Sequence, residues 1–389
     1  MIAEVSPVPH TEPENRWTLA RATATPLASI FGSGFLIIIP VLEPSFGRNS
    51  VFAIALVCGL AYLVGTAVRH NIRWSEGVPA ANLGALTKRL STASAALIAV
   101  AYTISVSLYL RIMVSYAFAY LGRDSEATEQ LIATAVVVVL VLVGATRGFD
   151  GLANIEYAAL AATIAIMGVL IVAFGHTVLD QQLSGDLALP RALHDDWANQ
   201  AMLLGGILIS VQGFETSRYL GNQFSETMRI RSCRLSQLIS TGVYLVFVAL
   251  CTPLMATAVP GATADHDLLE LTRNVVPWLV LPLALIAVFS QLSAAIADLV
   301  TAVGNVDEVS RGRARERITY VALGAVAIGV IWAATTLQLV AVASRAFAVF
   351  YLVQCVVASR TSRTRRASIA FLLLAVPLLF IALFAKPIG

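Results

Sequence analysis

Two glycine-containing clusters interrupt long apolar segments of this 389-residue chain at similar depths. The first is Gly32-Ser33-Gly34 and the second is Gly213-Phe214-Glu215. Unpaired backbone at membrane depth is tolerated only where it packs on protein or lines a cavity. Such backbone offers N–H donors and carbonyl acceptors to a ligand. A pair of breaks at corresponding places in two halves of a membrane protein therefore points to the substrate site of a transporter.

The first cluster suits the binding of a carboxylate. Two glycines around a serine permit a helix to unwind and let a ligand approach the bare backbone. The half-helix beyond the break presents its positive N-terminal end. The candidate binding residues here are Ser29, Gly32, Ser33, Gly34 and Phe35. The alternative is close helix packing, for which small residues are equally suited.

The second cluster adds Ser210, Gly213 and Phe214 as candidate binding residues. Phe214 is interpreted either as a lid over a bound substrate or as an ordinary core residue. Glu215 places a carboxyl group at membrane depth, which makes it a candidate functional residue by default. Its alternative role is to cap backbone N–H groups freed by the break.

Asp298 and Arg111 are further charged residues within apolar segments. Asp298 shares a helical face with Gln291 and Asn305, because the three are seven residues apart. An unpaired, ionised aspartate is costly in lipid, so Asp298 is expected to pair with Arg111, to carry a proton or to contact a cationic substrate. Arg111 either neutralises Asp298 or Glu215, or binds an anionic substrate group, and a buried ion pair is the favoured interpretation.

Composition predicts an all-α polytopic membrane protein. Hydrophobic residues make up 58% of the chain and charged residues 13%, and the mean hydropathy is +0.80. Eleven segments are apolar and long enough to span a bilayer. They are 24–42, 51–68, 93–121, 131–145, 152–174, 201–219, 238–259, 275–303, 318–335, 337–357 and 367–385.

The distribution of Lys and Arg predicts the orientation. With a cytoplasmic N-terminus, 18 of these residues fall in inner loops and 5 on the outer side. The C-terminus is then outside, and the cytoplasmic (inner) membrane is the expected location. We expect no cleavable signal peptide. The predicted division is a tail (1–23), a first repeat of five helices (24–175), an outer loop (176–200), an inverted second repeat (201–359) and an additional helix (360–389).

The motifs resemble those of the amino acid–polyamine–organocation (APC) superfamily. Gly32-Ser33-Gly34 is similar to its segment 1 motif, and residues 212–220 are similar to its segment 6 pattern of glycine, aromatic residue and glutamate. The resemblance implies a LeuT-like fold of two inverted five-helix repeats, with discontinuous helices 1 and 6 and one extra helix. Residues 222–229 depart from the family's usual acidic pair, Asn-Pro and basic run, which leaves subfamily and substrate open.

The resemblance also implies secondary transport of amino acids or related amine-bearing solutes by alternating access. The substrate carboxylate would meet N–H groups at Ser33, Gly34 and Phe35, and its amine would meet carbonyl groups around residues 210–213. In this family the glutamate matching Glu215 shapes the segment 6 break, and in some members it is linked to proton sensing.

Residues that relatives use for ion coupling are absent from this sequence, which limits the possible coupling ions. Sodium-coupled relatives carry adjacent hydroxyl residues in segment 8, whereas Ser290, Ser293 and Thr301 are not adjacent here. Segment 5 has no lysine of the kind found in proton-coupled members. Proton coupling through Glu215 or Asp298, or exchange without a coupling ion, remains.

Other function classes are weighed against this interpretation. One is transport of an inorganic ion or another small solute on the same fold, and another is a non-transporting membrane sensor or scaffold. No nucleophile–base set, metal-ligand cluster or phosphate-binding loop is apparent, so neither an enzyme nor a cofactor or metal site is expected. The expected partners are a small-molecule substrate such as an amino acid, the lipid bilayer and a proton, but no nucleic acid. The oligomeric state is left open.

Overall fold

The computed structural model describes residues 15–74, 84–123, 125–190, 196–221, 223–255, 268–269, 272–273, 276–310 and 312–385. These residues form helices and no strand. The α-helices are α1 (Arg16–Ser33), α2 (Phe35–Phe46), α3 (Ser50–Trp74), α4 (Ala85–Tyr120), α5 (Glu126–Ser184), α6 (Trp197–Gly206), α7 (Glu226–Met255), α9 (Val280–Ser310), α10 (Glu316–Ala333), α11 (Thr336–Thr361) and α12 (Arg365–Phe384). Short 3-10 helices are η1 (Gly47–Asn49), η2 (Leu208–Val211), η3 (Phe214–Tyr219) and η4 (Pro277–Leu279).

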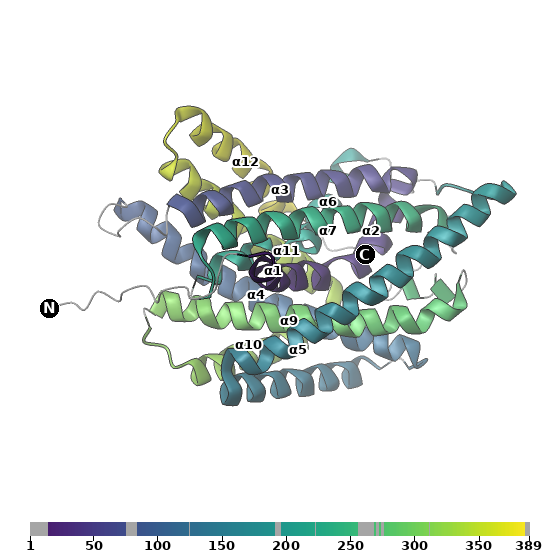
Figure 1. The fold of residues 1–389 in the computed structure, drawn as a ribbon, viewed down its shortest axis with the longest axis horizontal. Coiled ribbons are helices and arrows are strands. Elements are labelled where there is room, and N and C mark those ends of the chain that lie inside the picture. Colours follow the sequence, from purple (N-terminus) through teal and green to yellow (C-terminus); the bar gives the residue numbers. More distant parts are fainter. Residues whose placement is uncertain are drawn as a thin grey trace.

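All eleven predicted segments coincide with helical structure where the structure describes them, and residues 256–259 and 275 lie outside the described residues. Nine helices in the described part of the chain are long and apolar enough to cross a membrane. The other two predicted segments, 24–42 and 201–219, are the interrupted ones. Segments 4 and 5 both lie in α5, which doubles back at Gly148, where φ is 63° (Figure 1). The predicted all-α membrane architecture is therefore confirmed.

Two helices extend beyond the predicted limits of the membrane segments. α1 begins at Arg16, inside the predicted tail 1–23, because the Asn15 side chain caps it by accepting a hydrogen bond from Thr18 N at 2.9 Å. α5 continues to Ser184, inside the predicted outer loop 176–200, and ends at Gly185 with φ 82°. Hydropathy along the chain does not predict the start of α1 or the end of α5, because polar residues are frequent in both terminal turns. The limits of the two repeats stay predictions.

Burial separates central helices from peripheral ones. In α4, 83% of the most apolar stretch is buried, compared with 67% in the span that contains α9 and 61% in α11. In α12 the figure is 11%, and Figure 1 shows this helix at the outside of the bundle. Because every span is apolar, burial rather than hydropathy identifies the central helices, and α4, α9 and α11 form the frame on which the broken helices pack.

Gly32 brings α1 into close contact with α9. A Cβ atom at Gly32 would overlap the Cβ of Ala294 and lie 3.0 Å from the Ser290 carbonyl oxygen. Only a residue without a side chain fits between the two helices at this point. This close approach supports the packing interpretation of Gly32.

We expect Gly32→Ala to lower the free energy of unfolding by about 1–3 kcal/mol through overpacking. Ala294→Gly in the same protein should restore part of the loss, because it removes the opposing methyl group. Thermal unfolding in detergent measures both effects. Gly168→Ala is the control, since nothing lies within 4 Å of its Cβ position. An absence of rescue by Ala294→Gly would show that the contact does not determine the spacing of α1 and α9.

Candidate functional site

The first break is narrower than the glycine cluster predicts. α1 ends at Ser33 and α2 begins at Phe35, so only Gly34 lies between them, with φ −112° and ψ −63°. The first backbone hydrogen bond of the second helix runs from Ile38 N to Gly34 O at 3.0 Å. The side chains of Ser33 and Phe35 lie outside the described residues. The amides of the first turn of α2 thus begin directly at Gly34.

The second break is wide. α6 ends at Gly206, and irregular backbone and η2 lead to Gly213, whose φ of 122° favours glycine. A Cβ atom at Gly213 would lie 2.6 Å from Ile30 N, and one at Gly34 would overlap the Ser210 carbonyl oxygen. The two breaks therefore pack directly on each other, as the paired positions predict.

Glu215 is surrounded by hydrogen-bond donors. Its carboxylate accepts hydrogen bonds from Gly213 N at 2.9 Å, Tyr102 Oη at 3.1 Å and Tyr351 Oη at 2.7 Å. The residue is fully buried. This geometry supports the capping role, because one oxygen holds the backbone of the break and both oxygens are tied to α4 and α11.

Phe214 is a core residue in this arrangement. It is fully buried, and its ring stacks on Tyr351 with centroids 5.4 Å apart and planes at 9°. The ring therefore helps to hold Tyr351 against Glu215, which supports the packing interpretation over that of a lid.

Asp298 is joined to α1 by one hydrogen bond. Ser29 Oγ donates to Asp298 Oδ1 at 2.6 Å, whereas Asp298 Oδ2 has no hydrogen-bond partner among the described residues. Both residues are fully buried. The predicted residues Ser29 and Asp298 are thus brought together, and the Tyr109 hydroxyl is a further group that interacts with this carboxyl group.

Three further buried oxygens near the breaks share this property. Gln291 donates its amide to the Gly32 carbonyl oxygen, and Gln212 Nε2 donates to Tyr109 Oη at 2.6 Å. The Oε1 atoms of both glutamines and the Ser210 hydroxyl have no partner within the described part of the chain. A glutamine side-chain oxygen can only accept hydrogen bonds. Four buried oxygens on residues in or near the breaks therefore have no hydrogen-bond donor among the described residues. Three of them, on Gln212, Gln291 and Asp298, are acceptors, and the fourth is the Ser210 hydroxyl.

Sequence reasoning missed Gln212 and Tyr109 as site residues. Gln212 directly precedes Gly213, and a polar residue next to a break at membrane depth could have identified it as a site residue. Tyr109 lies on α4 two turns from Tyr102, and nothing in the sequence distinguishes it from the other tyrosines of that helix.

The predicted partner of Arg111 was wrong. Arg111 Nη2 lies 3.1 Å from Glu126 Oε1 at the start of α5, and Nη1 donates to the Ile331 carbonyl oxygen at 3.0 Å. Neither Asp298 nor Glu215 is among these contacts. Spacing along one helix does not show which neighbouring helix a side chain contacts. Arg111 instead binds the exposed Glu126 carboxylate and a carbonyl group near the end of α10.

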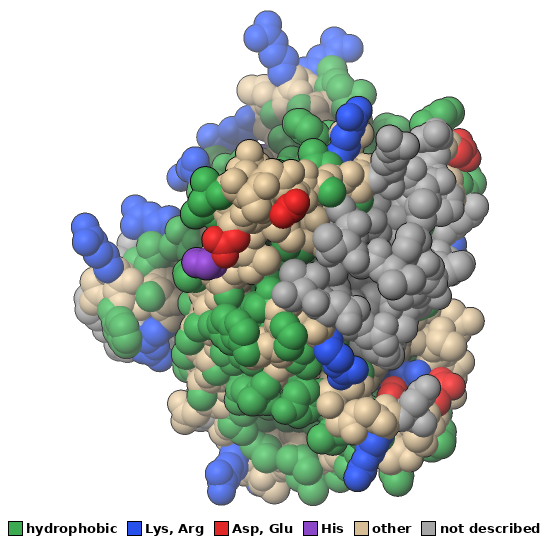
Figure 2. Space-filling view, turned by 90° about the vertical axis from the view of Figure 1, so that its right-hand side faces the viewer, with side chains coloured by type: hydrophobic (Ala, Val, Ile, Leu, Met, Phe, Trp, Pro, Cys, Tyr) green, Lys and Arg blue, Asp and Glu red, His purple; other side chains and the backbone are tan. Residues whose placement is uncertain are grey.

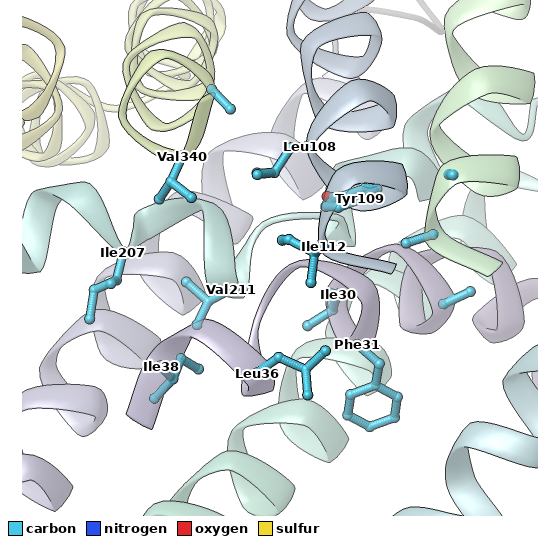
Figure 3. Packing of buried hydrophobic residues seen from close by; sticks show 14 of the residues in the cluster. Ile30, Phe31, Leu36, Ile38, Leu108, Tyr109, Ile112, Ile207, Val211 and Val340 are labelled. Carbon is cyan, nitrogen blue, oxygen red and sulfur yellow. The ribbon is translucent and has the colours of Figure 1, made fainter. Parts of the chain in front are cut away.

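The walls around the breaks are apolar. Figure 3 shows Ile30 and Leu36 on either side of the first break, with Val211 from η2 beside them. Leu108 and Ile112 of α4 project toward the same region. A guest here would meet a few fixed polar atoms within a hydrocarbon surface, as small-molecule sites usually provide.

A cavity of about 300 Å³ lies between η3, α9 and α10. Thr301 and Asp307 line it from α9, and Glu316 and Tyr320 line it from α10. Thr301 is one helical turn from Asp298. The cavity therefore comes within about one helical turn of Asp298, from the end of the bundle at which α9 finishes.

Comparisons with known proteins agree with this architecture. A family model described as an APC superfamily transporter matches residues 12–385. A protein of Aquifex aeolicus (strain VF5), described as uncharacterized, is 32% identical over 388 residues, which cover 98% of this chain and 93% of that protein.

Solved structures resemble the chain in fold. Mhp1, a nucleobase-cation-symport-1 family transporter in a closed conformation with bromovinylhydantoin bound, has a TM-score of 0.59 at 13% identity, covering 98% of this chain and 97% of that one. A manganese transporter mutant from Eremococcus coleocola has a TM-score of 0.57 at 13% identity, covering 97% and 88%.

We expect Glu215→Ala to destabilise the protein by about 2–5 kcal/mol, because it leaves a backbone N–H and two buried hydroxyls without their acceptor. Glu215→Gln keeps an acceptor oxygen and should cost clearly less. Thermal unfolding of both variants in detergent measures the difference. Equal losses in the two variants would contradict the capping role and show that the negative charge itself is required.

Proposed function

Because the chain belongs to the APC superfamily of transporters, we propose that it carries an amino acid or a related small amine-bearing solute by secondary active transport. Family membership and fold give a multi-pass membrane transporter with a LeuT-like fold rather than an enzyme. The substrate class, the coupling ion and the site residues are our proposal.

The unpaired buried oxygens carry this proposal. Ser210, Gln212, Gln291 and Asp298 each leave an oxygen without a donor among the described residues. A buried polar group without a partner costs about 1–3 kcal/mol, so the site favours a guest rich in donors. An ammonium group supplies three N–H donors and a positive charge, which suits three acceptors and a carboxylate.

The other end of the substrate would meet the second half-helix. The amides of the first turn of α2, from Gly34 and Phe35 onward, have no acceptor within the helix, and the helix N-terminus favours an anion. A carboxylate at α2 and an amine near Ser210 and Asp298 would place an amino acid across the first break. The apolar neighbours Leu108 and Ile112 would then surround its side chain.

A competing proposal is transport of a cation or another small solute. Oxygen ligands are those preferred by hard metal ions, and structural neighbours include a manganese transporter and a nucleobase-cation-symport-1 transporter. Both solute classes therefore belong in the same binding experiment.

We expect one class of amine-bearing solute to raise the melting temperature of the purified protein. A ligand at a hundredfold excess over its Kd stabilises the folded state by roughly 2.7 kcal/mol. The panel is the twenty amino acids, simple amines, purines, hydantoins, Mn²⁺ and Na⁺. Stabilisation by Mn²⁺ or a nucleobase alone would reject the amine in favour of the competing proposal.

The variant Ser210→Ala tests whether a stabilising ligand from this panel binds at the helix breaks. The Ser210 hydroxyl has no hydrogen bond within the described chain, so its removal should leave the ligand-free melting temperature unchanged. Loss of one hydrogen bond should weaken ligand binding about tenfold. Unchanged binding would place the ligand elsewhere.

We propose that Asp298 carries the coupling proton, because half of its carboxylate is unpaired and the α9–α10 cavity ends one turn away. Asp298→Asn keeps an acceptor for Ser29 but cannot release a proton. The variant should lose accumulation driven by a pH gradient in liposomes while keeping exchange of internal for external substrate. Asp186→Asn, at an exposed carboxyl group, is the control. Normal pH-driven accumulation by Asp298→Asn would exclude this residue as the proton carrier.

We place the protein in the cytoplasmic membrane with its N-terminus inside. The arginines at or just before the starts of α7, α10 and α12 then share one membrane face, as the positive-inside rule favours.

A further inference from the structure

Four arginines follow one another closely at the connection between α11 and α12. Arg360, Arg363, Arg365 and Arg366 occupy seven consecutive positions, and all four are exposed. We call these four residues, together with Trp74 at the end of α3, the arginine patch. Within the described chain no ion pair joins any of the four to a carboxylate, so their charge is not neutralised by the protein.

The arginine patch lies where three spans end. α3 finishes at Trp74, α11 at Thr361, and α12 begins at Arg365. Ends of membrane spans lie at the level of the lipid headgroups, where tryptophan and arginine are favoured. Figure 1 shows α12 at the outside of the bundle, beside the end of α3.

Specific contacts hold the patch together. The Arg363 guanidinium lies 3.9 Å from the centre of the Trp74 ring, a cation–π distance. One turn earlier, His70 Nε2 is 3.1 Å from Thr361 Oγ1, and the His70 ring is 5.3 Å from that of Phe371. Charge retained only for membrane orientation requires no such arrangement, because loop composition alone sets orientation.

The surface next to the patch is apolar. α12 exposes Leu372, Leu373 and Val376 by 48%, 66% and 63%. These residues begin about two turns beyond Arg365, so a molecule with its anionic group on the arginines would have its hydrocarbon chains along α12. Figure 2 shows the opposite end of the bundle, where acidic and basic side chains are interspersed.

We propose that the arginine patch binds an anionic membrane phospholipid. Its phosphate would be held by the guanidinium groups, which bind phosphate oxygens in pairs, and its acyl chains would cover the exposed face of α12. The site is separate from the helix breaks and does not depend on the proposed substrate.

The test measures retention and stabilisation by phosphatidylglycerol in detergent-purified protein, with phosphatidylcholine as the zwitterionic comparison. Each arginine near an anionic headgroup contributes roughly a fivefold factor in affinity. The combined variant Arg363→Gln, Arg365→Gln and Arg366→Gln should therefore bind phosphatidylglycerol on the order of a hundredfold more weakly. Native mass spectrometry counts the retained lipid, and thermal unfolding gives the accompanying shift in melting temperature.

A matched variant removes three arginines from another loop: Arg313→Gln, Arg315→Gln and Arg317→Gln. It should retain the phosphatidylglycerol effect. Equal losses in the two triple variants would overturn the site in favour of diffuse charge attraction. Equal stabilisation of the wild-type protein by both lipids would overturn it as well. Inorganic phosphate should have no effect, and a phosphate-induced shift of the same size would show that the patch binds a free anion instead.

Discussion

Backbone groups freed by a helix break inside a bilayer need protein partners, because the hydrocarbon offers none. The first break meets this requirement with side chains from other helices. Tyr244 Oη of α7 donates to the Ile30 carbonyl oxygen at 2.7 Å, and Gln291 of α9 donates to the Gly32 carbonyl oxygen. These bonds fix the broken helix between two intact ones. The position of the site, and the polar atoms left over around it, follow from this requirement.

The same bonds bear on movement. Alternating access requires the broken helices to move against α4, α9 and α11. Several separate hydrogen bonds join these two groups of helices, among them Ser29–Asp298, Glu215–Tyr351 and the bond from Gln291 to Gly32. One such bond contributes only about 0.5–1.5 kcal/mol net. The close contact of Gly32 with Ala294 leaves no free space between α1 and α9 at this point. Movement is therefore more easily accommodated by exchanging polar partners than by sliding α1 along α9.

Sequence reasoning located the helices well and their neighbours poorly. Length and hydropathy suffice for the spans, because a bilayer imposes both. The glycine positions predicted both breaks but not their different widths, because Gly34 keeps a right-handed conformation whereas Gly213 does not. The partner of Arg111 could not be predicted, because the sequence does not state which helices are adjacent. Gln212 was overlooked because its importance comes from an oxygen left unpaired, which only the three-dimensional arrangement defines.

The distribution of buried positive charge bears on the proposal of an amine-bearing substrate. Arg111 lies toward one end of α4 and contacts Glu126. Arg218 lies toward the other end, where Nη1 donates to Gln354 Oε1 at 2.7 Å and Nη2 to Ser91 Oγ at 3.4 Å. Residues 91 and 111 are about 30 Å apart along a helix. Neither arginine has Asp298 among these contacts. In a medium that penalises uncompensated charge, a carboxylate so placed is balanced by a proton or by a positively charged substrate, and competition between the two would couple their movements.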